Sequence, residues 1–137
     1  MAVVEELIAE GRDGSLDFGN YELSEKTKLS DFPSGGSLYK VKTFSEMTKL
    51  EKDEGFAYES EPGTAVRGFR MSEEEIVMTV EGPEDAQITV AGAPDANYAL
   101  YVDGKMSDII KTTLGGKLSF SVVLEKGRET AVRIVRQ

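Results

Sequence analysis

The chain has 137 residues and a mass of 15.0 kDa, enough for one ordinary domain or two very small ones, and its 39% hydrophobic residues suffice for a core. It contains no Cys and no His, which excludes disulfides, thiolate nucleophiles, Ser-His-Asp catalysis and the common zinc motifs. The formal net charge of -9 is spread over both halves, so we expect neither nucleic acid nor anionic membrane as a partner.

The first part of the chain has a mixed pattern. Apolar residues within 3–8 fit one side of a short helix, and a strand is also possible there. Residues 16–23 predict a tight hairpin that turns at Gly19-Asn20, and residues 32–37 predict a loop. Alternation over residues 39–43 predicts a strand with a solvated face of lysines.

Residues 43–58 allow two interpretations. Thr43 and Glu46 have the spacing of a capping box, which would begin a helix with apolar residues at helical spacing. Alternatively, the chain forms a hairpin that turns at residues 53–55 and returns with two aromatic residues. Phe44 is a weak helix former, which favours the hairpin.

Residues 64–136 alternate regularly between apolar and polar side chains, the pattern of half-buried strands. Asp103-Gly104 lies between two apolar segments and predicts a two-residue hairpin turn, because both positions of a type I′ turn need positive φ. Ile109-Ile110 breaks the alternation and predicts a bulge. The predicted strands are 64–70, 75–80, 86–90, 98–102, 106–113, 117–124 and 130–136.

These strands, with no helical window between them, predict an all-β antiparallel fold. We expect a small N-terminal β-hairpin region over residues 1–66, followed by an immunoglobulin-like or fibronectin-III-like sandwich over residues 67–137. Eight of the eleven aromatic residues precede Arg70, which favours a separate small core in the first region. The residues that share an inward phase in the second region are Leu100, Val102, Leu118, Phe120, Val122, Val132 and Ile134.

The N-terminus lacks the basic region of a secretory signal, and runs such as Leu100–Val102 are far shorter than the ~20 apolar residues of a membrane helix. We therefore expect a cytoplasmic protein unless a non-Sec route exports it. The acidic turns 81–85 and 95–97 do not follow the ligand order of a calcium loop. We expect no metal and no cofactor.

The 25 carboxylates could in principle supply an acid–base pair. Pairs such as Asp17 with Glu22, or Glu59 with Glu61, arise by chance at this density, and no apolar setting that would shift a pKa can be recognised around them. We therefore expect no catalytic residue and no enzymatic activity.

Exposed aromatic rings are the usual platforms on which β-sandwich modules stack sugars. Tyr39, Tyr58 and Tyr101 are the candidate surface residues for such binding. Tyr101 is opposite in phase to Leu100 and Val102, so its ring should point outward. The alternative is that these rings lie on the sheet as cross-strand partners, and the lack of Trp weakens the case for sugar binding.

Nearly the whole chain resembles a family of short bacterial proteins of about this length, which are often labelled "endosialidase". The stretches that carry the resemblance are Met1–Ile8, Gly19–Leu23, Leu38–Phe44, Tyr58–Val66 and Leu114–Ser119. The label implies a glycan-active enzyme of the sialidase type. No catalytic residue is carried over, because the stretches consist of turns and sheet faces.

Taken together, these features predict a non-catalytic β-sandwich that serves as a protein–protein interaction or scaffold module, as a monomer or weak oligomer. A carbohydrate-binding accessory module is the first alternative. A glycan-active enzyme, as the family label implies, is the second.

Overall fold

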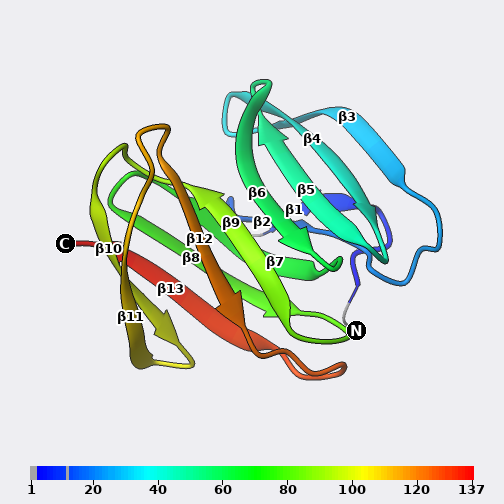
Figure 1. Ribbon diagram of the computed structural model, residues 1–137. Coiled ribbons are helices and arrows are strands. Elements are labelled where there is room, and N and C mark those ends of the chain that lie inside the picture. Colours follow the sequence, from blue (N-terminus) through cyan, green and yellow to red (C-terminus); the bar gives the residue numbers. More distant parts are fainter. Residues whose placement is uncertain (1–2, 12) are drawn as a thin grey trace.

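A computed structural model describes residues 3–11 and 13–137; Met1, Ala2 and Arg12 lie outside the described residues. Of the described residues, 62% are in strands and none is in a helix. Two antiparallel sheets face each other as a sandwich (Figure 1). The predicted all-β antiparallel class is therefore confirmed.

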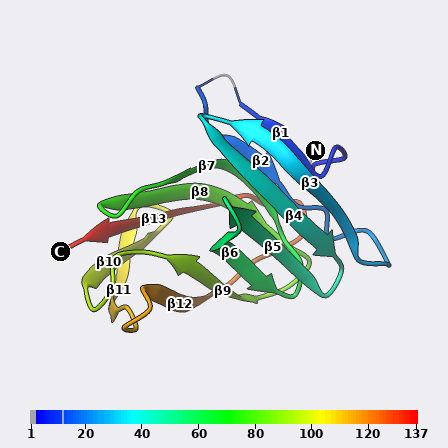
Figure 2. The same cartoon turned by 90° about the horizontal axis from the view of Figure 1, so that it is seen from above.

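Sheet A has seven strands and sheet B has six. The order in sheet A is β1-β2-β7-β8-β13-β10-β11, and the order in sheet B is β12-β9-β6-β5-β4-β3. Seen from above, β1–β4 gather at one end of the sandwich and β10–β12 at the other (Figure 2). The strands are β1 (Ile8–Glu10), β2 (Leu16–Phe18), β3 (Thr27–Ser34), β4 (Ser37–Phe44), β5 (Met47–Lys52), β6 (Gly55–Glu61), β7 (Ala65–Met71), β8 (Glu75–Glu81), β9 (Ala86–Ala91), β10 (Asn97–Val102), β11 (Lys105–Lys111), β12 (Lys117–Val122) and β13 (Thr130–Arg136).

The turns follow the chemistry of their residues. Asp103 and Gly104 have φ of 51° and 83°, as the predicted type I′ hairpin turn requires. Asp53 and Glu54 also have positive φ, and β5 pairs with β6 across this turn. Of the two interpretations of residues 43–58, the hairpin is therefore confirmed and the helix is absent. The expected loop at residues 32–37 is instead the β3–β4 hairpin, which turns at two glycines.

The N-terminal region differs from the expectations at two places. Residues 3–8 allowed a short helix or a strand; they form no helix, and of these residues only Ile8 lies in a strand, β1. Residues 16–23 form no hairpin, because β2 pairs with β1 and β7. At Gly19 the chain passes so close to the Thr64 carbonyl that a Cβ would lie 2.3 Å from its oxygen. The next residues bond to the β4–β5 hairpin, where the Asn20 N–H donates to Thr43 Oγ1 and the Leu23 carbonyl accepts from the Ser45 N–H.

The predicted bulge exists, two residues earlier than expected. β10 pairs Leu100 with Asp108 and Tyr101 with Met106, which leaves Ser107 as the extra residue. Of the seven predicted core residues of the second region, all are buried except Val102, which packs partly buried against the core. The predicted inward phase is thus correct.

The expected boundary between residues 66 and 67 falls inside β7. Both sheets combine strands from both sides of it, since β2 pairs with β7 in sheet A and β6 pairs with β9 in sheet B. One buried cluster also draws on both regions. The sequence pattern suggested two units because it cannot show pairing between distant strands.

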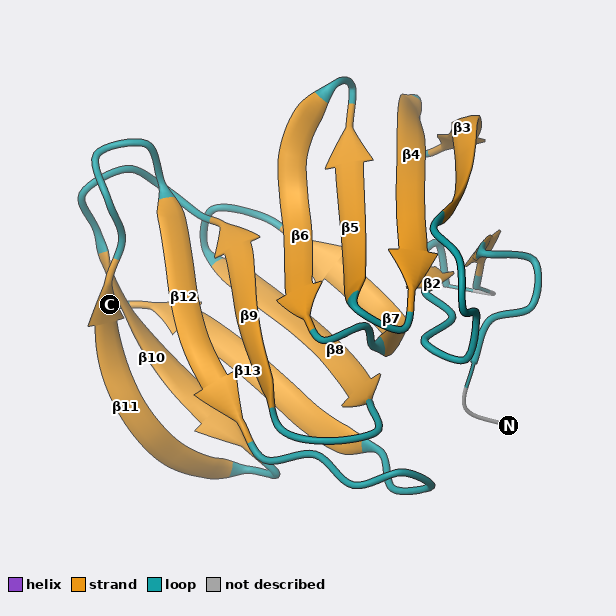
Figure 3. Ribbon diagram, turned by 45° about the vertical axis from the view of Figure 1, so that its right-hand side comes forward, coloured by secondary structure: helices purple, strands orange, loops and turns teal. Residues whose placement is uncertain are grey.

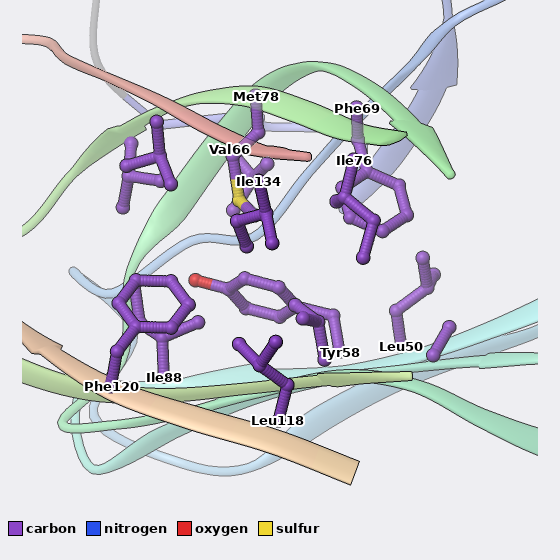
Figure 4. Packing of buried hydrophobic residues seen from close by; sticks show 14 of the residues in the cluster. Leu50, Tyr58, Val66, Phe69, Ile76, Met78, Ile88, Leu118, Phe120 and Ile134 are labelled. Atoms are coloured by element: carbon purple, nitrogen blue, oxygen red, sulfur yellow. The ribbon is translucent and has the colours of Figure 1, made fainter. Parts of the chain in front are cut away.

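Tyr58 lies at the centre of the core between the two sheets (Figure 4). Its ring meets those of Phe18 and Phe69 edge to face, at centroid distances of 5.2 and 6.1 Å. These rings come from β6, β2 and β7, so they join the two sheets. The aromatic residues of the first region therefore belong to the shared core.

Candidate functional site

Three lysines stand side by side on the outer face of sheet B. The register pairs Lys28 of β3 with Lys42 of β4, and Lys42 with Lys49 of β5. Directly opposed residues have Cβ atoms only about 4.5–5.5 Å apart, and like charges there are destabilising. We call these three residues the lysine row.

Few carboxylates offset this charge. Lys49 Nζ lies 4.0 Å from Glu51 Oε2. In the part of the chain that the structure describes, Lys28, Lys42 and the neighbouring Lys40 form no ion pair. The row ends at β6, where the residue opposite Lys49 is Glu59. The row therefore keeps an excess of positive charge.

Two aromatic rings flank the row, and each lies under a further lysine. Lys26 Nζ lies 5.9 Å from the centroid of the Phe44 ring, and Lys117 Nζ lies 4.7 Å from that of Phe56. We call the whole surface the lysine face. Its members are Lys26, Lys28, Lys40, Lys42, Lys49 and Lys117, the rings Phe44 and Phe56, and the carboxylates Glu51 and Glu59.

This face cannot be recognised from the sequence alone. The alternating Lys40 and Lys42 were predicted as a solvated face, which agrees with their position opposite the buried Val41 and Thr43. The remaining lysines come from other strands, and only the pairing of β3, β4 and β5 brings them together. The available signal was the K-x-K spacing on one predicted strand.

A hollow of about 650 Å³ adjoins Lys40 and is lined by the middle of β3, the start of β4, the end of β5 and the turn that follows it. Tyr39, a predicted surface residue, lines it half-buried, and burial together with Asp53 raises the pKa of its hydroxyl. Asp53 accepts a hydrogen bond from the Leu38 N–H at 2.9 Å, and this bond holds the pKa of the carboxyl below its usual range. Both groups keep their ordinary charge at neutral pH.

Tyr58 is not a surface residue, and its prediction as one is wrong. The side chain is fully buried, and its hydroxyl bonds to Thr64 Oγ1 at 2.8 Å. Burial raises the pKa of this hydroxyl to about 12. Thr64 Oγ1 also bonds Ser60 Oγ at 2.8 Å, and Thr64 N–H donates to Thr48 Oγ1 at 3.0 Å. This hydroxyl network ties the β6–β7 connection to β5.

Tyr101 is half-buried and lies on the outer face of sheet A. It lines a hollow of about 400 Å³ together with Val77, Arg133 and neighbouring residues. The Arg133 guanidinium lies 5.9 Å from the ring centroid and is paired with Glu75. Tyr39 and Tyr101 belong to different sheets, so the structure does not bring the predicted tyrosines into one site.

Several carboxylates are engaged in structural contacts. Asp17, considered with Glu22 as a chance pair, accepts from the Gly68 N–H at 2.9 Å and lies 3.5 Å from Arg67. Glu81 is buried, and its Oε2 accepts from the Tyr21 hydroxyl at 2.9 Å and from the Gly127 N–H at 2.7 Å. The described residues hold no group of three or more carboxylates placed to bind a metal ion.

Comparisons with protein-family models, curated proteins and solved structures find no match to this chain. Function is therefore inferred from the geometry of the molecule itself. Over the described residues, no helix has the length and apolar character needed to cross a membrane. The surfaces that carry distinctive chemistry are the lysine face and the hollow at Tyr101.

Proposed function

We propose that this protein is a non-catalytic interaction module that binds the acidic surface of a partner protein through the lysine face. The lysine row carries the proposal. Directly opposed like charges cost a sheet stability, and within the described residues no carboxylate pairs with Lys28 or Lys42. Glu51 and Glu59 offset only part of this repulsion, and a feature that weakens the fold with incomplete local compensation is typical of a functional site.

The charge distribution favours a protein over a continuous polyanion. The chain as a whole carries -9, which repels nucleic acids and anionic membranes. Glu51 and Glu59 lie within the lysine face, where they would repel an unbroken run of phosphates but would pair with basic residues of a mixed protein surface. The Phe44 and Phe56 rings add apolar contact area, as at protein interfaces.

The carboxylates with a lowered pKa are unsuited to general acid catalysis. Asp13, Asp53 and Asp103 have pKa values held below the usual range, chiefly by hydrogen bonds from neighbouring groups. General acid catalysis needs a carboxyl whose pKa is raised towards the working pH. These three carboxylates stay ionised at neutral pH, so they have no proton to donate there.

The test is binding of a fluorescent 20-residue peptide of alternating Glu and Ala, measured by anisotropy at low salt. The row variant K28Q/K42Q/K49Q removes three positive charges, and K105Q/K111Q/K126Q removes three from outside the face. Exposed ion pairs contribute about 0.2–1 kcal/mol each, so the row variant should bind about tenfold more weakly and the control within about twofold of the parent.

Equal loss in the two variants would contradict the proposal, since binding would then follow net charge alone. Tighter binding of a single-stranded DNA 20-mer or of polysialic acid, dependent on the same three lysines, would also contradict it. Tighter binding of the DNA or of polysialic acid would assign the face to a polyanion instead of an acidic protein.

A carbohydrate-binding module is the second candidate, and the hollow at Tyr101 favours it. A half-buried ring beside the paired Arg133 and Glu75 offers an apolar platform and hydrogen-bonding groups for a sugar. Tyr101→Ala should then abolish binding to a glycan array without weakening the binding of the acidic peptide.

The two-layer architecture supports a relation to immunoglobulin-like modules. The thirteen strands of the described residues exceed the about seven to nine strands of those modules.

A further inference from the structure

The strands that end the two sheets differ in how they are protected. An edge strand leaves unpaired backbone groups that can template another strand, and proteins usually blunt such edges. β1 has only three residues, and β3 carries a register shift and Pro33. β11 carries a register shift, and the Asp108 carboxylate accepts the Ile109 N–H at 2.8 Å.

β12 has none of these devices. It pairs with β9 along six residues without a register shift, and Leu118–Val122 contains neither a charge nor a proline. Ser119 Oγ bonds Thr89 Oγ1 at 2.8 Å, and Ser121 Oγ donates to Gln87 Oε1 at 2.7 Å, which holds the strand flat on its neighbour. Beyond Lys117, β12 is therefore a regular edge without a charge, a proline or a bulge.

The free backbone groups on β12 can be identified. Gly116 C=O accepts from Gly92 N–H at 2.7 Å, and hydrogen-bonded residues alternate along an antiparallel pair. Lys117 therefore faces away from β9, and its N–H and C=O are already bonded to Thr113. By the same alternation Ser119 and Ser121 direct their N–H and C=O groups to the open side.

That open side has room for a chain. β11 and β12 are end strands of the two sheets on the same side of the sandwich, and the Thr113–Lys117 turn connects them (Figure 3). Between them lies a hollow of about 550 Å³, lined by residues of both strands and by Leu100. Its lining includes the apolar Phe120 and Ile110 as well as Ser119 and Ser121.

We propose that β12 accepts an extended segment of a partner protein as an added strand of sheet B. The backbone groups of Ser119 and Ser121 supply the hydrogen bonds, as in other cases of strand addition. Side chains that point inward would meet Phe120 and Ile110 and should be apolar. Outward ones would lie beside the two serines and should be small and polar, which defines a segment of alternating residues such as Val-Thr-Val-Thr.

A second copy of this chain fits the edge less well. Its β11 adjoins its own β12 at the hollow, so a second copy would bring that strand to the hollow as well. Each copy also carries a charge of -9. This site is distinct from the lysine row and goes beyond the proposed function, so either proposal can fail alone.

The test is hydrogen exchange by NMR on the full chain, with the probe peptide acetyl-Lys-Val-Thr-Val-Thr-Val-Lys-amide. In the free protein the Ser119 and Ser121 amides should exchange fast and those of Leu118 and Phe120 slowly. Saturating peptide should slow the two serine amides at least tenfold. The proposal would be overturned if the two serine amides exchanged slowly in the free protein at every protein concentration. It would also be overturned if the peptide slowed the exchange of amides elsewhere in the protein and not these two.

A matched pair of variants isolates the backbone contribution. Ser121→Pro removes the N–H of Ser121, which points to the open side and forms no bond to β9. Edge strands tolerate proline at such a position. Ser121→Ala keeps the N–H and loses only the hydroxyl. Ser121→Pro should bind the peptide at least tenfold more weakly and Ser121→Ala within about twofold of the parent. Equal peptide affinities of the two variants would refute the partner strand. So would protection of the serine amides that increases with protein concentration, because it would indicate a dimer.

Discussion

Lys42→Gln should stabilise the protein, although it removes a charged residue from a well-ordered strand. Lys42 is the middle member of the lysine row, with Lys28 on one side and Lys49 on the other. Glutamine keeps most of the aliphatic stem and the β conformation while removing the charge. The substitution therefore relieves two repulsive contacts and leaves the packing nearly unchanged.

The size of the effect follows from the register. Cross-strand pairs contribute about 0.2–1 kcal/mol each, and like charges are unfavourable by a similar amount. Glu51 lies diagonally across from Lys42 and offsets part of the repulsion. We therefore expect a gain of about 0.5–1 kcal/mol, or roughly 2–4 °C in melting temperature for a chain of this length.

Urea unfolding of Lys42→Gln, Lys49→Gln and Lys105→Gln at low and at 1 M salt tests this reasoning. Lys49 faces one lysine and one carboxylate and contacts Glu51, so its variant should gain nothing. Lys105→Gln reports the effect of net charge alone. At 1 M salt the Debye length falls to about 3 Å and the gain should vanish. A gain shared by all three variants, or one that persists in high salt, would refute a local repulsion.

Four further outcomes are expected. Phe120→Ala should cost about 3–5 kcal/mol in urea unfolding, from lost burial and the cavity left behind. Tyr58→Phe should cost about 1–3 kcal/mol by the same measure, because Thr64 Oγ1 loses a buried partner. The pKa of Asp103 is lowered by Arg128 from the ordinary 3.8, so its stabilising contribution is present above pH 3.8 and is lost as pH falls below it. Asp103→Asn should therefore lose less stability than the parent between pH 4 and pH 2 in urea titrations. Incubation with polysialic acid should release no sialic acid above the buffer rate, and turnover would support the enzyme implied by the family label.

The second half of the chain could be predicted because its signals are local. Alternation within each strand, together with Asp103-Gly104 at the hairpin, defines strands and phase without knowledge of their partners. The inward phase of Phe120 and Ile134 is correct for this reason. Even the misplaced bulge lies within the expected strand, because the break in alternation at Ile109 follows the extra residue Ser107.

The first half could not be predicted because its structure depends on distant contacts. β2 pairs with β7 from far along the chain, and Gly19 is shaped by the carbonyl of Thr64. Tyr58 was misplaced for a related reason. A register shift opposite Leu50 makes Ala57 the extra residue of β6, so the ring of Tyr58 turns inward. Nothing in the local alternation marks that bulge.

The two proposed sites share sheet B, and this has a structural consequence. Lys117, at the start of β12, belongs to the lysine face through its contact with Phe56. A strand added beside Ser119 and Ser121 would extend sheet B beyond Lys117, and its outward side chains would continue the surface that the lysines occupy. Because a rigid sheet joins the two sites, a partner that contributes both an acidic surface and an alternating segment gains from a high effective concentration at the second contact. A moderate affinity at each site then suffices for a stable complex.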